Sequence, residues 1–430
     1  MIRSSWRAAP AVTAALLLVV AGCSGRSGAG ATTAGGGGAN CSGVNTGKSG
    51  ADTIKIISSL PMTGSSLGQT QTIVNAICMA VEERGGKVGN YTIVYEPLDD
   101  ATPAKGSWDE GKEAENANRA INDADVMAYI GTFNSGAAKV SIPLMNRANL
   151  VMVSPANTYP GLTKPGKGEA NEPDVYYPTG KRNYARVVPA DDLQGAVGAK
   201  EAQQLGAKRV YVLDDSELYG RGLATVFHQE AKRRGLDVSP PNAPDSIDKQ
   251  ASDYRSLALK VKQANPDFVY FGGITQSNAG KLWQDLRAQL GKDVKLMGPD
   301  GIFEQAFLDA AGDTAMDTYV TFGGVPVKNY QGKAQEWLQR YRDKYKSDPE
   351  VYAVYGYDAA SAVLDAIAQA NKKDRATITQ AVMGTKDHDG ALGKWSFDAN
   401  GDTTLTNLSV SQFKGPKIDQ VQFISMMTAD

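Results

Sequence analysis

The chain has 430 residues, of which 42% are hydrophobic and 21% charged, and its formal net charge is −2. This length is more than one small domain uses and predicts two lobes, while the near-neutral charge excludes a basic surface for nucleic acid. Because the chain holds only two histidines and three cysteines, a His/Cys metal site is not expected.

The first residues have the pattern of an export signal. Two arginines precede an apolar stretch over 8–20 that is too short to span a bilayer. Two small residues, Ala21 and Gly22, then stand directly before Cys23, a pattern typical of cleavage by a lipoprotein signal peptidase. We therefore predict a signal peptide over 1–22 and a lipid anchor on Cys23, on the outer face of a bacterial cell membrane. The alternative is an ordinary secretory signal or an uncleaved anchor.

A Gly/Ser/Ala-rich segment over 23–51 follows, and its composition predicts a flexible linker. It contains Cys41, and the next cysteine is Cys78 in a predicted helix. An exported location permits a disulfide between these two residues. They could equally be one exposed linker thiol and one thiol packed within the fold.

From residue 52 onward, short apolar runs alternate with longer amphipathic ones. This alternation indicates parallel sheets covered by helices on both faces, and two such series predict two doubly wound α/β lobes. A Pro- and Gly-rich stretch over 161–184 separates the series and is predicted to be a surface loop. The strands are expected at 54–57, 91–95, 126–130, 150–153, 209–213, 268–271, 294–297 and 319–322, with shorter ones over 395–413. The helices are expected at 70–83, 112–121, 137–147, 194–205, 223–234, 254–264, 280–290, 334–345 and 359–370.

Polar residues follow several of the predicted strands, where open parallel sheets bind their ligands. Hydroxyl groups such as that of Ser135 stand at predicted helix starts, which suit a carboxylate, and Asp300 offers a partner to an ammonium group. A site with both is complementary to a free α-amino acid. Each residue also has a structural interpretation, because Ser135 and Asp300 could cap helices and Tyr219 could be a core wall.

Four motifs resemble the leucine/isoleucine/valine-binding proteins of branched-chain amino acid ABC transporters, and the resemblance runs from Thr53 to Phe413. The motifs are VSPANT (153–158), YGRGLA (219–224), DFVYFGG (267–273) and MGPDG (297–301). The resemblance implies a type I periplasmic binding protein fold, with two lobes joined by three hinge crossovers near 187–189, 321–323 and 408–410. It places the first lobe at 52–187 and 324–408, and the second lobe at 188–323 and 409–430.

The same resemblance assigns roles within the site. Ser135 and Thr158 would bind the ligand's carboxylate, the backbone carbonyl of Ala156 and the Asp300 carboxylate would bind its ammonium, and Tyr219 would close over it. Many relatives have Glu in place of Asp300. The expected contacts also include three apolar residues: Leu67, where relatives often have an aromatic residue, Ile274, where they often have Tyr, and Phe133.

Together these features predict an extracellular lipoprotein of an ABC importer that captures a branched-chain or similar apolar amino acid and delivers it to the permease. We expect a monomer that binds no cofactor, metal or nucleic acid. Two other binding functions stay open. One is a receptor for urea, a short amide or an aromatic acid, and the other is a sensory receptor that passes lobe closure to a signalling partner.

A serine hydrolase is a remote alternative. The segment GSSLG over 64–68 matches the G-x-S-x-G pattern of a nucleophile elbow, with Ser66 as the nucleophile. An elbow joins a strand directly to a helix, whereas residues 61–63 intervene here. The only candidate bases are His228, in a Lys/Arg-rich helix, and His388, in a late polar loop. We therefore do not expect an enzyme.

Overall fold

The computed structural model describes residues 49–428. Cys23, Cys41, the predicted signal peptide and nearly all of the predicted linker lie outside this range. Across 49–428, no helix combines the length and the apolar character that crossing a membrane requires.

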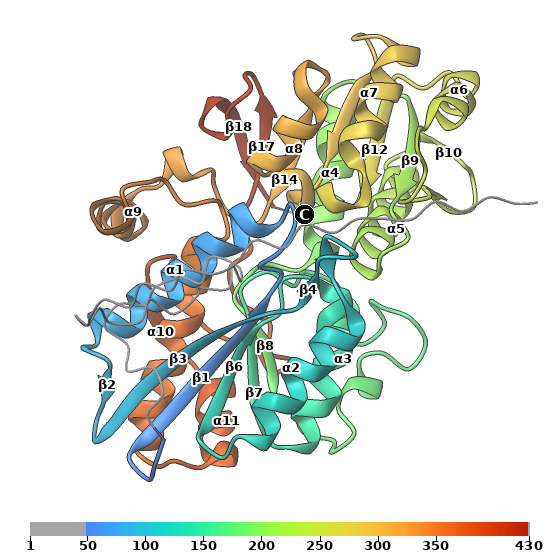
Figure 1. Ribbon diagram of the computed structural model, residues 1–430. Helices are drawn as coiled ribbons and strands as arrows, with labels where there is room; N and C mark the ends of the chain where they lie inside the picture. Colours follow the sequence, from blue (N-terminus) through green and yellow to red (C-terminus); the bar gives the residue numbers. More distant parts are fainter. Residues whose placement is uncertain (1–48, 429–430) are drawn as a thin grey trace, which may run out of the picture. The chain divides into compact units, whose positions relative to one another are not determined.

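The first lobe is built on a six-stranded sheet with the order β2-β3-β1-β6-β7-β8 (Figure 1). Only the β2–β3 pair is antiparallel. The central strand β1 is almost entirely buried, as expected for a parallel strand covered on both faces. The strands are β1 (Thr53–Leu60), β2 (Lys87–Val88), β3 (Tyr91–Asp99), β6 (Val126–Gly131), β7 (Val151–Ser154) and β8 (Tyr184–Arg186), with a separate pair β4 (Ala101–Thr102) and β5 (Ser107–Trp108).

Helices from both ends of the chain cover this sheet. Helix α1 packs along α10, while α2 packs on α3 and α11 contacts β6 and β7. Helix α9 is joined to α1 by the Tyr345 hydroxyl, which donates to the Asn75 carbonyl at 2.6 Å. The helices are α1 (Leu67–Glu83), α2 (Glu110–Asn122), α3 (Ser135–Arg147), α9 (Gly332–Tyr345), α10 (Ala353–Ala370) and α11 (Arg375–Met383).

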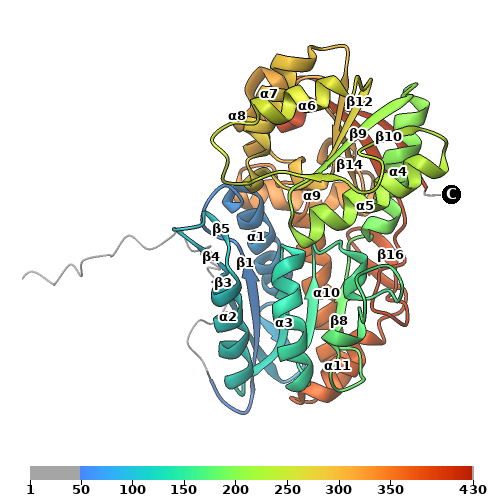
Figure 2. The ribbon, with the colours of Figure 1, turned by 90° about the vertical axis from the view of Figure 1, so that its right-hand side faces the viewer.

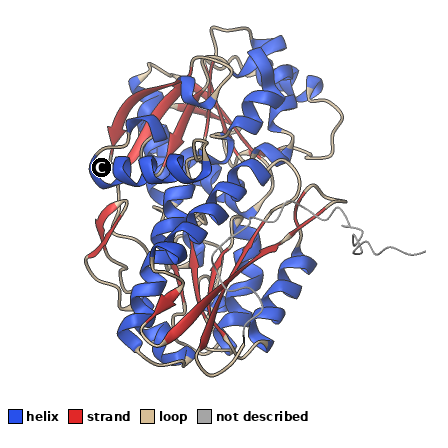
Figure 3. Cartoon of the chain, turned by 60° about the vertical axis from the view of Figure 1, so that its left-hand side comes forward, coloured by secondary structure: helices blue, strands red, loops and turns tan. Residues whose placement is uncertain are grey.

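The second lobe has an eight-stranded sheet with the order β10-β9-β12-β13-β14-β17-β18, and β11 also pairs with β9. Its strands are parallel except β17 and β18, which pair antiparallel, and helices lie on both sides of it (Figure 3). The strands are β9 (Arg209–Asp214), β10 (Asp237–Ser239), β11 (Asp245–Ser246), β12 (Phe268–Gly272), β13 (Lys295–Gly298), β14 (Tyr319–Phe322), β17 (Leu408–Phe413) and β18 (Val421–Met427). The helices are α4 (Asp191–Gln204), α5 (Leu218–Arg233), α6 (Arg255–Gln263), α7 (Ala279–Leu290) and α8 (Gln305–Ala311).

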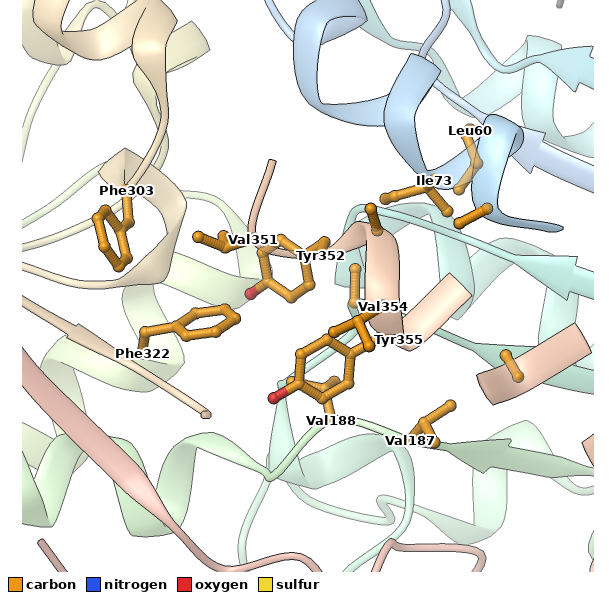
Figure 4. Close-up of a cluster of buried hydrophobic side chains, with 14 of the residues drawn as sticks. Leu60, Ile73, Val187, Val188, Phe303, Phe322, Val351, Tyr352, Val354 and Tyr355 are labelled. Atoms are coloured by element: carbon orange, nitrogen blue, oxygen red, sulfur yellow. The ribbon is translucent and has the colours of Figure 1, made fainter. Parts of the chain in front are cut away.

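The chain crosses between the lobes after β8, after β14 and before β17, so the predicted two-lobed α/β fold with three crossovers is confirmed. Residues 408–410, where the third hinge is expected, already belong to β17. Buried aromatic residues fill the space between the crossovers (Figure 4). The rings of Phe322 and Tyr352 meet edge to face with centroids 5.3 Å apart, which packs the two lobes against each other at this point.

The segment over 161–184 is more than a surface loop. It holds two short 3₁₀ helices, η1 (Pro160–Leu162) and η2 (Asp174–Tyr176), and buries Tyr176 and Tyr177. The Glu172 carboxylate is the shared acceptor in this small core, since it accepts hydrogen bonds from the hydroxyls of Tyr159 and Tyr176. Because this segment has no apolar period, its small core of buried tyrosines was not predicted from the sequence.

Cys78 lies buried on α1 and is disulfide-bonded. Cys41, the partner expected from the sequence, lies outside the described residues. The pairing of these two cysteines stays a prediction.

Candidate ligand-binding site

The strand ends of both lobes meet at one cavity. Every expected ligand contact except Leu67 lines it. In this conformation it measures about 30 Å³, which is room for about one or two water molecules. An amino acid can therefore enter only if the lobes separate. The lining residues are Phe133, Asn134, Ser135, Gly136, Ala156, Thr158, Glu217, Tyr219, Ile274, Asp300, Gly301 and Tyr352.

One side of the cavity is suited to a carboxylate. Ser135 is the first residue of α3, where unpaired backbone N–H groups point away from the helix. The Thr158 side chain follows β7, and its hydroxyl has no hydrogen-bond partner among the described residues although the residue is only 1% exposed. Because this hydroxyl also lies on the cavity wall, it is available to hydrogen-bond a ligand there.

The opposite side carries a carboxylate that is already held in place. Asp300 begins a 3₁₀ helix after β13 and is buried. Its Oδ1 accepts from the Tyr219 hydroxyl at 2.7 Å and from Gln194 Nε2 at 2.6 Å, and its Oδ2 accepts from the Tyr352 hydroxyl. Burial raises the pKa of Asp300, while these three hydrogen bonds oppose that shift.

A second buried carboxylate lies beside it, on a residue that sequence reasoning missed. Asp191 is the first residue of α4, and its backbone N–H donates to the Thr158 carbonyl at 2.9 Å. It is fully buried, and in the described part of the chain neither of its carboxylate oxygens has a hydrogen-bond partner. Burial and the neighbouring charge of Asp300 raise the pKa of Asp191 well above its ordinary value, although the nearby Thr158 hydroxyl and the Arg186 charge oppose that shift. Since no lining residue is basic, this side of the cavity attracts a cation.

Between the two polar sides stands an apolar wall. Phe133 and Tyr352 meet edge to face with ring centroids 5.6 Å apart, and Ile274 is buried beside the cavity. Tyr352 precedes α10, so a residue far along the sequence joins the strand-end residues only through the tertiary fold. No local signal marks it, whereas Asp191 could have been noticed as an acid directly after a predicted crossover.

Leu67 is not brought to the cavity. It begins α1, is 37% exposed and does not line the site. Its neighbour Gln69 reaches the second lobe instead, where its Nε2 lies 3.4 Å from Glu304 Oε2. The ligand contact expected of Leu67 stays a prediction.

The elements of a serine hydrolase are not assembled. Ser66 precedes α1 and is buried, while His228 Nε2 lies 2.8 Å from the Pro240 carbonyl in the second lobe. His388 Nδ1 lies 3.3 Å from the Asp365 carboxylate. Neither imidazole is therefore placed to activate the serine.

The chain is similar to known binding proteins over most of its length. A family model described as periplasmic binding protein matches residues 53–417. A Leu/Ile/Val-binding protein homolog of Brucella abortus is 28% identical over 351 residues, which cover 80% of this chain and 86% of the relative. A leucine-, isoleucine-, valine-, threonine- and alanine-binding protein of Pseudomonas aeruginosa is 25% identical over 368 residues, covering 84% of this chain and 90% of the relative.

Solved structures show the same fold. A leucine-binding protein of Thermotoga maritima superposes with a TM-score of 0.75 at 26% identity, covering 87% of this chain and 98% of that protein. A solute-binding protein of Rhodopseudomonas palustris in complex with p-hydroxybenzoic acid gives a TM-score of 0.73 at 18% identity, covering 88% and 98%, and this likeness concerns the fold alone. These relatives are binding proteins, which confirms that the chain is not an enzyme. The chain belongs to the periplasmic binding protein family, and its resemblance to the leucine/isoleucine/valine-binding members is confirmed.

Proposed function

We propose that this protein is the receptor of an ABC importer and captures a branched-chain or similar apolar amino acid between its two lobes. The observation that carries the proposal is the opposition across one cavity of the buried Asp300 carboxylate and the buried Thr158 hydroxyl. A zwitterion satisfies both sides at once.

The lining residues support one orientation of the ligand. Its ammonium group would lie between Asp300 and the Ala156 carbonyl, with Tyr219 alongside. Its carboxylate would accept from the hydroxyls of Ser135 and Thr158 and from the N–H groups at the start of α3. The side chain would then face the wall formed by Phe133, Ile274 and Tyr352. This wall offers an apolar side chain only apolar and aromatic surface, which favours leucine, isoleucine or valine over charged amino acids.

Closure of the lobes would complete the site. The carboxylate-binding groups belong to the first lobe and Asp300 to the second, so the ligand stabilises the closed form by contacts that the open form lacks. We place the lobes at 52–187 with 324–408 and at 188–323 with 409–430. A lipid on Cys23 would hold this monomeric receptor beside the permease that reads the closed form.

A thermal-shift screen tests the proposal on the mature chain with Cys23 replaced by Ser. The candidates are leucine, isoleucine, valine, lysine, glutamate, acetamide, urea and benzoate. A ligand at 100 times its dissociation constant adds about 2.7 kcal/mol of stability. We expect a rise in Tm with the apolar amino acids that is lost in Asp300→Ala and kept in Asp293→Ala, an exposed control.

Other outcomes would redirect the assignment. A shift with benzoate, urea or acetamide but with no amino acid would keep the fold and overturn the ligand class. Binding of leucine that survives Asp300→Ala unchanged would overturn the role given to that carboxylate.

A further inference from the structure

We propose that the segment from Tyr159 to Glu172, here named the latch, holds the two lobes together and thereby sets the affinity for the ligand without contacting it. The latch belongs to the first lobe and contacts α4 and α5 of the second. The inference rests on the proposed function in one respect, because it assumes that the ligand is held in the closed form.

The first contact is made by the Tyr159 ring. Tyr159 directly follows the ligand-binding candidate Thr158, and its hydroxyl donates to Glu172 Oε2 at 2.7 Å. The same oxygen accepts from the Glu169 backbone N–H at 2.7 Å, so the latch itself fixes the orientation of the ring.

This ring lies directly on the backbone of α5 at Gly222. A Cβ atom at Gly222 would stand 2.6 Å from Tyr159 Cδ2, which is closer than two nonbonded carbon atoms can approach. Glycine at this position therefore permits the contact between the lobes. Gly222 lies one helical turn after Tyr219, so the contact is made one turn away from the site. Figure 2 shows α5 at the junction of the two lobes, above α3.

Two ion pairs reach the second lobe from the same segment. Lys164 Nζ lies 2.8 Å from Asp192 Oδ1 on α4, and these side chains are only 22% and 14% exposed. Glu169 pairs with Arg221 on α5, where both side chains are about half exposed and solvent weakens the pair. The Lys164–Asp192 pair is thus expected to contribute more to closure.

These contacts exist only while the lobes are together, so they raise the fraction of closed protein before any ligand binds. The apparent dissociation constant of a ligand that binds the closed form rises in proportion as that fraction falls. Weakening the latch should therefore weaken binding and open the ligand-free protein, even though the ligand-binding groups are unchanged.

Gly222→Ala separates closure from folding. The methyl group blocks the ring of Tyr159 in the closed form, yet alanine is more favourable than glycine in a helix interior. We expect the affinity for leucine, measured by calorimetry, to fall at least tenfold while the Tm of the ligand-free protein does not fall. Gly68→Ala on α1 is the matched control, because a Cβ there has no atom within 4 Å, and it should leave the affinity unchanged.

A second measurement does not depend on the ligand. Spin labels on the exposed positions 115 and 255, one in each lobe, report the distance between the lobes in ligand-free protein. Gly222→Ala should shift this distance distribution to longer values and Gly68→Ala should not. Unchanged distributions in Gly222→Ala would overturn the latch. Failure of the parent protein to bind leucine would count against the proposed function alone.

The ion pair is tested by exchanging its charges. Lys164→Asp and Asp192→Lys should each weaken leucine binding and lengthen the distance between the labels, and the double variant should recover part of both losses. Single variants that leave the distance unchanged would show that this pair is not part of the latch.

Discussion

The Tyr219 hydroxyl donates to Asp300 Oδ1 at 2.7 Å and accepts from the Gly301 backbone N–H at 3.1 Å. One phenol thereby fixes both the carboxylate and the loop that carries it. A carboxylate that is already oriented loses little further freedom when it binds an ammonium group. The structure thus gives Tyr219 a positioning role in addition to the covering role implied by the sequence.

Tyr219→Phe should weaken leucine binding roughly 10-fold, because a hydrogen bond to a charged group contributes about 1.5–3 kcal/mol. The ring remains, so the Tm of the ligand-free protein should change little. Calorimetric titration measures the affinity. Tyr270→Phe is the control, since the Tyr270 hydroxyl is buried without a hydrogen-bond partner in residues 49–428. An equal loss of affinity in both variants would contradict the role of Tyr219.

The framework of the fold could be predicted from the sequence because strands and helices differ both in hydrophobic periodicity and in length. The predicted helix over 137–147 lies within α3, and the predicted strand over 268–271 lies within β12. Helices α8 and α11 and the edge strand β18 were missed. Strand β18 is antiparallel to β17 at the edge of the sheet, and its exposed residues alternate with less exposed ones, so it lacks a continuous apolar run.

Some residues of the candidate site could be predicted from the sequence and others could not. Residues directly after strands, such as Thr158 and Asp300, could be found from the rule that parallel strands place their ends together. Gln194 lies on α4, after the first crossover, and Tyr352 directly precedes α10. Only the folded arrangement turns these two side chains toward Asp300. Leu67 shows the opposite case, since a position implied by resemblance lies away from the cavity.

The predicted disulfide between Cys41 and Cys78 should stabilise the first lobe. It would close a loop of moderate length, for which a gain of about 2–4 kcal/mol is typical. Cys41→Ser should lower the Tm in non-reducing buffer, and dithiothreitol should lower the Tm of the parent protein to a similar value. Peptide mapping without reduction checks the pairing. A Cys41 thiol that reacts freely with iodoacetamide in the folded protein would contradict it.

The stability of the protein should fall as pH rises toward neutrality. Glu113 is fully buried between the Ser59 and Tyr129 hydroxyls. Burial raises its pKa from 4.5 to about 7, and burial together with the Glu113 charge raises that of Asp100. The pKa of each carboxyl is higher in the folded protein than in the unfolded chain. The stability that these protonated carboxyls contribute is therefore fully present below their ordinary pKa values and is lost as pH rises through about 7.

Glu113→Gln should remove much of that pH dependence. The rise in the pKa of Glu113 from 4.5 to about 7 corresponds to about 3 kcal/mol. The variant should therefore match the parent protein near pH 4.5 and have a higher free energy of unfolding at pH 8. Urea titrations across this range measure the difference. Glu115→Gln on the same helix is the control, since that side chain is 68% exposed. Parallel curves for the parent protein and Glu113→Gln would refute the assignment.

Asp191→Asn should make the protein more stable and a poorer receptor. The Asp191 carboxylate is buried without a hydrogen-bond partner in the described residues, so its charge costs folding energy that an amide largely avoids. We expect the free energy of unfolding at pH 8 to rise by roughly 1–3 kcal/mol, with a gain that shrinks as pH falls, because burial raises the pKa of the parent carboxyl and so favours its protonated form.

Leucine affinity should fall at least tenfold in the same variant, because the Asp191 charge, which lies beside Asp300, adds to the attraction for the ammonium group. Urea titration and calorimetry on the same preparation measure both effects, with the exposed Asp293→Asn as the control. Loss of stability would mean that the carboxylate has a structural partner. Unchanged affinity would mean that Asp300 alone binds the ammonium. The two opposite changes together would show that this buried charge is kept for binding at the expense of stability.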